Sequence, residues 1–195
     1  MKVGVIDYGV GNLGSVLRAS EELKATPILI SRAVDLPKTD ALILPGVGSF
    51  ADCMQILIGG DWDQAICEEV HHKKPLLGIC LGMQLLADAG EEGASPDRPI
   101  AGLGLIPGRV SRLNGLGCNA RIPHVGWNAI SKKRDHTLLD GIPDGTDFYF
   151  VHSYAFVPQR DEDVIAVTEY GVQVTAAVAH SNVWGAQFHP EKSSR

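Results

Sequence analysis

The sequence predicts an α/β protein built on a central, mostly parallel sheet with an antiparallel extension. In the first half, short apolar runs alternate with segments of helical periodicity, which is typical of parallel strands joined by helices. From about Leu103 onward, this alternation gives way to short β-rich segments separated by glycine and proline. No linker-like composition separates the two halves. We therefore expect residues 1–195 to form a single domain.

The first half contains apolar runs typical of strands buried in a parallel sheet, at residues 3–6, 28–30 and 41–44. Between the first two runs, apolar residues recur at helical spacing from Leu13 to Leu23. A second helical pattern covers residues 62–70 and precedes a fourth apolar run at residues 76–79. This order predicts a sheet that helices cover on both faces.

The second half contains short candidate strands without helical patterns between them. They lie at residues 108–110, 148–151, 164–167, 172–174 and 183–188. Successive strands with glycine and proline between them favour antiparallel pairing. We expect them to extend the parallel sheet into a mixed one.

The composition excludes several classes of function. Hydrophobic residues make up 45% and charged residues 21% of the 195 residues, which suits an ordinary globular domain with a buried core. The net charge of −6 argues against a general nucleic-acid binder. Four widely spaced cysteines without a C-x-x-C pair favour free thiols over disulfides or a zinc site. The first apolar run begins at Val3 and no run reaches membrane-spanning length, so we expect a cytoplasmic protein. We also expect that it needs no metal and no cofactor.

The segment Leu76-Leu77-Gly78-Ile79-Cys80-Leu81-Gly82-Met83-Gln84 gives the strongest signal for catalysis. It reads as an apolar strand, a cysteine on a turn and a helix with periodic positions at Leu81, Gln84, Leu85 and Asp88. Glycines flank Cys80 as in a nucleophile elbow, because a sharp turn brings backbone segments too close for side chains. A helix N-terminus would also favour the thiolate. The alternative is a small buried cysteine between incidental glycines.

The segment Pro45-Gly46-Val47-Gly48-Ser49-Phe50 follows the third predicted strand. Its glycines let the backbone turn with N–H groups pointing outward, as is needed to hold a developing oxyanion. By itself the segment fits any strand-to-helix turn. Because neighbouring parallel strands end at the same edge of a sheet, we expect it to lie beside the cysteine elbow.

The segment His189-Pro190-Glu191 follows the last apolar strand. If the strand conformation persists, the side chains of His189 and Glu191 lie on the same side. Glu191 then orients one imidazole nitrogen while the other faces a thiol, as in a nucleophile, base and orienter triad. The alternative is a surface turn at a proline.

Other histidines are weaker candidates for catalysis. His71 and His72 are adjacent on a predicted helix, so they point different ways and make a poor metal pair. His124 and His152 lie in aromatic-rich segments, which indicates structural or interface positions.

A dinucleotide site is a rival function, because Gly9-Val10-Gly11-Asn12-Leu13-Gly14 satisfies G-x-G-x-x-G between a strand and a helix. Two details count against it. Asp7 and Tyr8 separate the first glycine from the strand, and the second strand ends at Arg32 instead of an acidic residue, although arginine suits a 2′-phosphate. A tight loop that needs glycines is the simpler interpretation.

The cysteine elbow and the distal His-Pro-Glu together resemble the class I, triad-type glutamine amidotransferases. Further segments resemble the glutaminase subunits of imidazole glycerol phosphate synthases, from histidine biosynthesis: residues 7–13, 45–50, 122–128 and 149–154. The match runs in order from residue 2 to residue 195. The resemblance implies a flavodoxin-like, three-layer α/β/α fold.

The resemblance also assigns catalytic roles. It implies that Cys80 is the nucleophile, His189 the acid–base and Glu191 its orienter. Backbone N–H groups of Leu81 and of Gly46-Val47-Gly48 would meet the oxyanion, and in the family that strand is thought to need reorientation first. The implied chemistry is thiolate attack on the glutamine carboxamide, expulsion of ammonia and hydrolysis of the thioester.

Glutamine binding is likewise implied by the resemblance alone. Gln84 and Glu92 would hold the substrate, together with backbone near Ser153 and Tyr154. The family usually has a serine before its Glu-Glu pair, whereas Gly90 stands there in this sequence, so we expect a different local turn.

A partner subunit is the last implication of the resemblance. Ammonia would pass to a cyclase, a (β/α)8 barrel bound as a heterodimer, which makes imidazole glycerol phosphate and aminoimidazole carboxamide ribotide. By family position, Trp127, Asn128, Tyr149 and Lys192 line the interface and the ammonia passage. Tryptophan and tyrosine are also frequent anchors of interfaces on physical grounds.

Two alternative functions and two departures from the family pattern accompany this interpretation. A paralogous amidotransferase that feeds a related barrel in nucleotide-sugar modification would share the same glutaminase site. A non-enzymatic binding module on the same scaffold is disfavoured by the intact Cys80, His189 and Glu191. Ala155 replaces a residue that is commonly polar or aromatic, and the family continues past residues 192–195 into a closing helix that we expect to be missing here.

Overall fold

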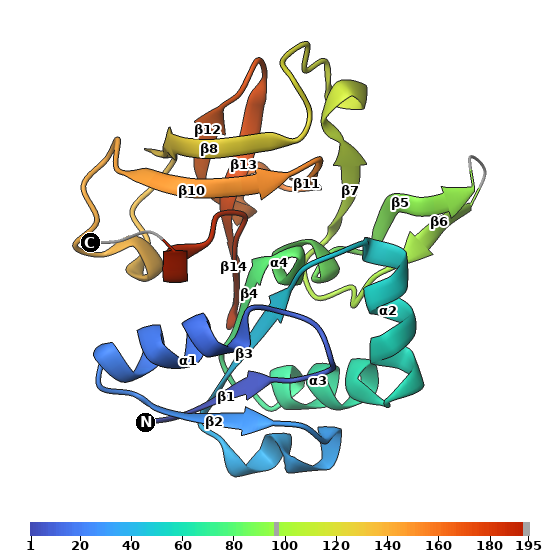
Figure 1. The fold of residues 1–195 in the computed structure, drawn as a ribbon, viewed down its shortest axis with the longest axis vertical. Coiled ribbons are helices and arrows are strands. Elements are labelled where there is room, and N and C mark those ends of the chain that lie inside the picture. Colours follow the sequence, from blue (N-terminus) through green and yellow to red (C-terminus); the bar gives the residue numbers. More distant parts are fainter. Residues whose placement is uncertain (96–97, 193–195) are drawn as a thin grey trace.

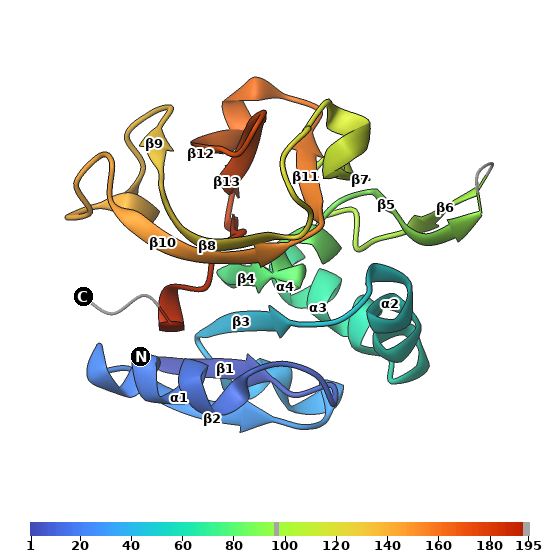
Figure 2. The ribbon, with the colours of Figure 1, turned by 45° about the horizontal axis from the view of Figure 1, so that its top comes forward.

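The computed structural model describes residues 1–95 and 98–192 of the chain. The expected absence of a closing helix concerns residues 193–195, which lie outside the described residues. The largest sheet has eight strands in the order β2-β1-β3-β4-β14-β13-β12-β9. Figures 1 and 2 show helices packed against its N-terminal half and β-strands packed over its other half.

The parallel half of this sheet carries the cysteine segment on an inner strand. Within this half, each strand pairs in parallel with its neighbours. They are β1 (Lys2–Ile6), β2 (Thr26–Ile30), β3 (Ala41–Gly46), β4 (Leu76–Cys80) and β14 (Val183–Ala186). The first four ranges contain the apolar runs predicted in the first half of the sequence, so the prediction of a parallel sheet is confirmed.

The antiparallel half continues from β14 through β13 (Gln173–His180) and β12 (Val164–Glu169) to the short β9 (Ser131–Lys132). The strand β14 therefore pairs in parallel with β4 on one side and antiparallel with β13 on the other. The predicted mixed sheet with an antiparallel extension is confirmed.

Alternate residues of the parallel strands feed two separate cores. Val5, Ile43 and Ile79 pack with α1 (Leu13–Glu22) on one face. Ile6, Leu42 and Leu44 pack on the other face with residues of helices that include α2 (Phe50–Gly59), α3 (Trp62–His71) and the 3-10 turn η1 (Ala33–Lys38). The period of two along each strand places successive side chains on opposite faces. The prediction of helices on both faces is thus confirmed.

The antiparallel half is covered by a two-stranded ribbon of β8 (His124–Ala129) and β10 (Asp147–His152). Phe148 and Phe150 of β10 pack against Ile165 and Ala177 of the large sheet. Beside the ribbon lies a third sheet in the order β11-β7-β5-β6. Its strands are β11 (Tyr154–Pro158), β7 (Gly108–Arg112), β5 (Ala89–Ser95) and β6 (Arg98–Ala101).

Several boundaries differ from the sequence expectations. The helix after Cys80, α4 (Leu81–Leu85), ends before Asp88, whose carboxylate instead accepts the backbone N–H of Gly108 at 2.9 Å. The last strand ends at Ala186, before the expected Phe188. The remaining 3-10 turns are η2 (Leu113–Leu116), η3 (Thr137–Leu139), η4 (Asp161–Asp163) and η5 (Pro190–Lys192). Within the described ranges, we find no helix of a length and apolarity that would cross a membrane.

Candidate active site

Cys80 occupies the sharp turn between β4 and α4. Its φ of 55° and ψ of −112° are strained for a residue with a side chain. A Cβ on Gly78 would lie 2.5 Å from the Gly82 carbonyl oxygen, and a Cβ on Gly82 would lie 1.8 Å from that of Leu44. Both positions therefore require glycine, as the sequence pattern predicts. The turn leaves the Cys80 side chain at a junction of strand and helix, only 7% exposed.

The predicted base reaches Cys80 because β14 is the neighbour of β4, with Ala186 paired to Ile79. His189 Nδ1 lies 2.7 Å from Glu191 Oε1, and both side chains are buried. The strand conformation does not persist to Glu191, contrary to the condition on which the sequence prediction rested. Glu191 instead lies in the 3-10 turn η5. This turn, and not strand alternation, places the Glu191 carboxylate next to the imidazole.

Opposing effects set the charge of His189. Burial lowers its pKa, but hydrogen bonds to Cys80 and Glu191 and the charges of these groups outweigh burial and raise the pKa to about 9. The imidazolium is therefore favoured near neutral pH. A protonated His189 between a sulfur and a carboxylate is suited to general acid–base work.

The predicted oxyanion segment ends β3 at the same sheet edge. Gly46 pairs with Cys80, which confirms that the two turns are neighbours. A Cβ on Gly46 would lie 2.7 Å from the backbone nitrogen of Gly82, so the two segments touch through their backbones. Gly48 has a φ of +100°, which favours glycine. The Cys53 thiol donates to the Val47 carbonyl oxygen at 3.5 Å.

A cavity of about 380 Å³ opens beside these residues. Most of the predicted site residues line it: Val47, Gly48, Cys80, Leu81, Gln84, Glu92, Ser153, Tyr154, His189 and Lys192. Gly46 and Glu191 do not line it and support residues that do. Pro123, Val151 and His152 also line the cavity and were not predicted as site residues.

The two side chains expected to hold glutamine are fixed by protein contacts. Gln84 Nε2 donates to the carbonyl oxygen of Tyr154 at 2.9 Å and to Oε1 of Gln187 at 2.8 Å. Glu92 Oε2 accepts the backbone N–H of Phe50 at 2.8 Å. Burial raises the pKa of Glu92, and this backbone hydrogen bond opposes the shift. Gln187, for which the sequence predicted no role, thus supports the residues that line the cavity.

Three of the predicted interface residues form a cluster, in which Trp127 and Lys192 are exposed and Tyr149 is half-buried. Trp127 of β8 is 53% exposed, and its ring lies edge-on to that of Tyr149 with centroids 6.0 Å apart. Lys192 Nζ lies 5.5 Å from the centroid of the Tyr149 ring. Asn128 faces the other side of β8, where its Nδ2 donates to the carbonyl oxygen of Glu169 at 2.9 Å. Strand alternation separates Asn128 from this cluster.

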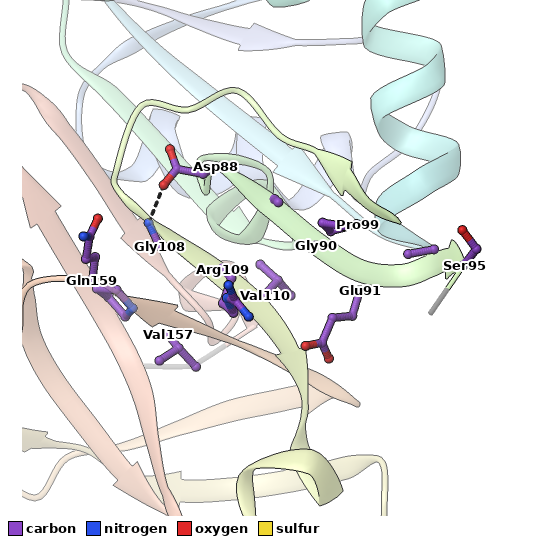
Figure 3. Close-up of a pocket in the computed structure, with 13 residues that line it drawn as sticks. Asp88, Gly90, Glu91, Ser95, Pro99, Gly108, Arg109, Val110, Val157 and Gln159 are labelled. Atoms are coloured by element: carbon purple, nitrogen blue, oxygen red, sulfur yellow. Dashed lines mark hydrogen bonds between the residues drawn. The ribbon is translucent and has the colours of Figure 1, made fainter. Parts of the chain in front are cut away.

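A larger cavity of about 830 Å³ lies between β5, β7 and β11 (Figure 3). Its carboxylates are already bound within the protein. Asp88 accepts the N–H of Gly108, and Glu91 accepts the hydroxyl of Ser111 at 2.8 Å and the N–H of Arg112 at 3.2 Å. None of its lining residues is a cysteine or histidine. The smaller cavity is therefore the candidate active site.

The glycine-rich loop after β1 has a backbone explanation. Gly9 and Gly11 have φ values of +93° and +123°, and a Cβ on Gly11 would lie 3.3 Å from Pro45. Glycine suits these conformations, which supports the simpler interpretation of a tight loop. Among the residues that the structure describes, no cluster of histidine, cysteine and carboxylate side chains could hold a metal ion.

His124 and His152 form a buried pair. Their nearest ring nitrogens, His124 Nδ1 and His152 Nε2, lie 3.0 Å apart. Burial lowers the pKa of His124 to about 4. Burial also lowers the pKa of His152 to about 4, against the effect of its hydrogen bond to the Tyr154 carbonyl. Both rings are therefore neutral near pH 7.

This pair should make the fold sensitive to acid. Between pH 6.5 and 4 the unfolded chain binds protons at these histidines and the native state does not, so the free energy of unfolding falls as pH falls. The slope is about 1.4 kcal/mol per pH unit for each histidine. Urea unfolding at pH 7, 6 and 5 measures it. His124→Phe should make the slope shallower, and an unchanged slope would contradict a neutral, buried His124.

Comparison with known proteins decides the family. The family described as Glutamine amidotransferase class-I matches residues 4–195. The chain belongs to this family. The resemblance of the cysteine and histidine motifs is thus confirmed, and this amidotransferase is an enzyme.

The curated relatives carry a more specific name than the family does. The amidotransferase is 46% identical to "Imidazole glycerol phosphate synthase subunit HisH" of Desulfitobacterium hafniense over 98% of this chain and 88% of the relative. It is 49% identical to the protein of the same name from Geobacillus thermodenitrificans, over 98% and 89%. The resemblance to this subunit is confirmed.

Solved structures with low sequence identity support the fold. "Structure of PurLQS from Thermotoga maritima" matches 98% of this chain and 88% of its own with a TM-score of 0.75 at 19% identity. "Crystal structure of glutamine amidotransferase" matches 97% and 90% with a TM-score of 0.72 at 21% identity. The expected flavodoxin-like α/β fold with an antiparallel extension is therefore confirmed.

Proposed function

We propose that this amidotransferase is the glutaminase subunit of an imidazole glycerol phosphate synthase, acting as one domain over residues 1–195. It would hydrolyse glutamine to glutamate and ammonia in the cytoplasm. The observation that carries the proposal is the meeting of Cys80 and His189 at one cavity, with Glu191 bound to the imidazole. The relatives named as this subunit and the four cysteines, all free, support it.

In the proposed mechanism, Cys80 attacks the carboxamide carbon of glutamine as a thiolate. His189 holds the thiol proton as an imidazolium and gives it to the leaving nitrogen, which departs as ammonia. His189 then takes a proton from water, which attacks the thioester and releases glutamate. Glu191 keeps the imidazole oriented through Nδ1 and balances its charge, as the 2.7 Å contact supports.

We assign the remaining cavity residues to substrate and oxyanion. Backbone N–H groups of Leu81 and of Gly46-Val47-Gly48 would hold the oxyanion, since these segments meet at the sheet edge. The substrate itself would be held by Gln84, Glu92, Ser153 and Tyr154. All four line the cavity next to Cys80.

The proposed partner is a (β/α)8 cyclase subunit bound as a heterodimer. It would receive ammonia and form imidazole glycerol phosphate and aminoimidazole carboxamide ribotide. Trp127, Tyr149 and Lys192 would contact it, because they gather beside the cavity and aromatic side chains often anchor interfaces. Asn128, on the inner side of the same strand, would line the ammonia passage.

The partner should control the rate of hydrolysis. We expect low glutaminase activity from the amidotransferase alone and a rise of at least 100-fold with the cyclase and its nucleotide ligand, about 3 kcal/mol of coupling. The Gly46-Val47-Gly48 segment can change conformation, since Gly48 is a glycine at positive φ and the Val47 carbonyl oxygen accepts a weak thiol hydrogen bond. Glutamate release, measured for each combination, tests this.

Each other outcome of this experiment has a meaning. Full activity in the isolated subunit would contradict control by the partner. Hydrolysis without any rise in the presence of this cyclase would point to another acceptor, such as the barrel of a nucleotide-sugar pathway. An absence of hydrolysis in every combination would contradict the glutaminase assignment itself.

A further inference from the structure

A continuous chain of hydrogen bonds crosses the interior of the β8–β10 ribbon. Asn128 Nδ2 lies 3.3 Å from His124 Nε2, and His124 Nδ1 lies 3.0 Å from His152 Nε2. His152 Nδ1 lies 2.8 Å from the carbonyl oxygen of Tyr154. The chain therefore starts on β8, crosses β10 and ends on the first residue of β11.

The direction of this chain is fixed by its two ends. The Tyr154 carbonyl can only accept, so His152 carries its proton on Nδ1 and accepts at Nε2. His124 must then donate from Nδ1 and accept at Nε2, where the Asn128 amide supplies a donor. Each neutral histidine has one donor and one acceptor, and here both are used. A protonated ring would place two donors face to face.

The far end of the chain lies at the active site. The Tyr154 carbonyl oxygen that accepts from His152 also accepts from Gln84 Nε2 at 2.9 Å. Gln84 Nε2 donates in addition to Gln187 Oε1 at 2.8 Å, and Gln187 Nε2 lies 3.8 Å from the Cys80 sulfur. One carbonyl oxygen thus joins the histidine pair to the side chain that lines the cavity.

Packing holds the pair in place. The His124 ring is stacked between Phe150, with centroids 4.9 Å apart, and Tyr170, with centroids 3.9 Å apart. His124 is 1% exposed. His152 is also buried and lines the cavity. Because a buried polar group without its partner is costly, loss of one member of the chain should displace the others.

We propose that His124 and His152 are positioning residues for substrate binding. The pair fixes the Tyr154 carbonyl and, through it, the Gln84 amide, so the shape of the cavity depends on the position of β8. Neither histidine is assigned a role in bond making. The inference rests on the proposed function only in taking glutamine as the occupant of the cavity.

Two thiol reagents separate substrate binding from thiol reactivity. Acivicin, a glutamine analogue, must occupy the cavity to alkylate Cys80, whereas iodoacetamide is smaller and needs only access to the sulfur. For His124→Phe, which keeps the stacked ring and removes both hydrogen bonds, we expect a roughly tenfold slower reaction with acivicin. The iodoacetamide rate should change by less than about twofold. Cys80 labelling is followed by mass spectrometry on the full chain.

Two further variants make the test specific. Tyr170→Phe keeps the ring stacked on His124 and removes only the remote hydrogen bond to the Arg121 carbonyl, so both rates should stay unchanged. His124→Asn can place an amide donor near the position of Nδ1 and should recover part of the acivicin rate. A loss in Tyr170→Phe as large as that in His124→Phe would show a packing effect and overturn the proposal.

A double-variant comparison tests the chain as a unit. Asn128→Ala should slow the acivicin reaction, and adding it to His124→Phe should cause little further loss, because both changes break one chain. Independent, multiplying losses would overturn the proposal. Circular dichroism confirms that each variant folds. If acivicin fails to label the unaltered protein while iodoacetamide labels it, the proposed function fails, which is distinguishable from failure of the positioning role.

Discussion

Cys80→Ala is expected to lower the rate of glutamine hydrolysis by roughly 10⁴-fold or more, because no other group at the cavity can form the thioester. Glutamate release measured with the partner cyclase tests this. The fold should survive, since alanine is smaller and the contacts of Cys80 with Val151 and Gln187 are weak, at 3.8 Å.

Other single changes give this prediction its controls. Cys67→Ala, the same substitution at a thiol that donates to the Leu103 carbonyl, should leave hydrolysis unchanged. His189→Asn should be nearly as severe as Cys80→Ala. Glu191→Gln should be milder by roughly 10- to 100-fold, because in the proposed mechanism Glu191 orients the imidazole without reacting. Substantial hydrolysis by Cys80→Ala would show that the nucleophile is another residue.

Gly82→Ala is expected to have the largest effect on stability. The added Cβ would lie 1.8 Å from the Leu44 carbonyl oxygen and 2.9 Å from the Leu44 carbonyl carbon, which belong to the neighbouring strand. A backbone cannot yield as a flexible side chain does, so β3 and α4 must separate. We expect a loss of more than about 3 kcal/mol and a fall in Tm of roughly 10 °C.

A matched glycine in another helix provides the comparison. A Cβ on Gly59, the last residue of α2, meets nothing within 4 Å. Gly59→Ala should therefore be neutral or stabilising by up to about 1 kcal/mol through helix propensity. Thermal unfolding of the two variants measures the difference. Equal Tm values would contradict the close approach of β3 and α4.

The sequence was most informative where one residue type is required by geometry. Gly78 and Gly82 are explained by backbone contacts, so the elbow around Cys80 was visible in the sequence. The apolar runs of the parallel strands, buried on both faces, likewise left an unmistakable pattern. Proximity of Gly46 to Cys80 followed from the rule that parallel strands end at one edge.

The sequence was less informative where contacts form between distant segments. Nothing local indicates that His124 and His152 pair, because they are 28 positions apart and meet only through the β8–β10 register. The hydrogen bonds of Gln187 depend on how the chain leaves β14. The position of Glu191 was expected from strand alternation, and a 3-10 turn supplies it instead. These features depend on tertiary geometry that no periodic pattern encodes.

The place of β14 between β4 and β13 also bears on the biosynthesis of the enzyme. During synthesis, β4 has an unpaired edge until residues 183–186 emerge, and Gln187 lies 107 positions after Cys80. At about 5–20 residues per second, roughly 5 to 20 s pass between the synthesis of Cys80 and that of Gln187. A nascent chain therefore carries the thiol without the imidazole, and under the proposed mechanism it should not consume glutamine until β14 has been inserted.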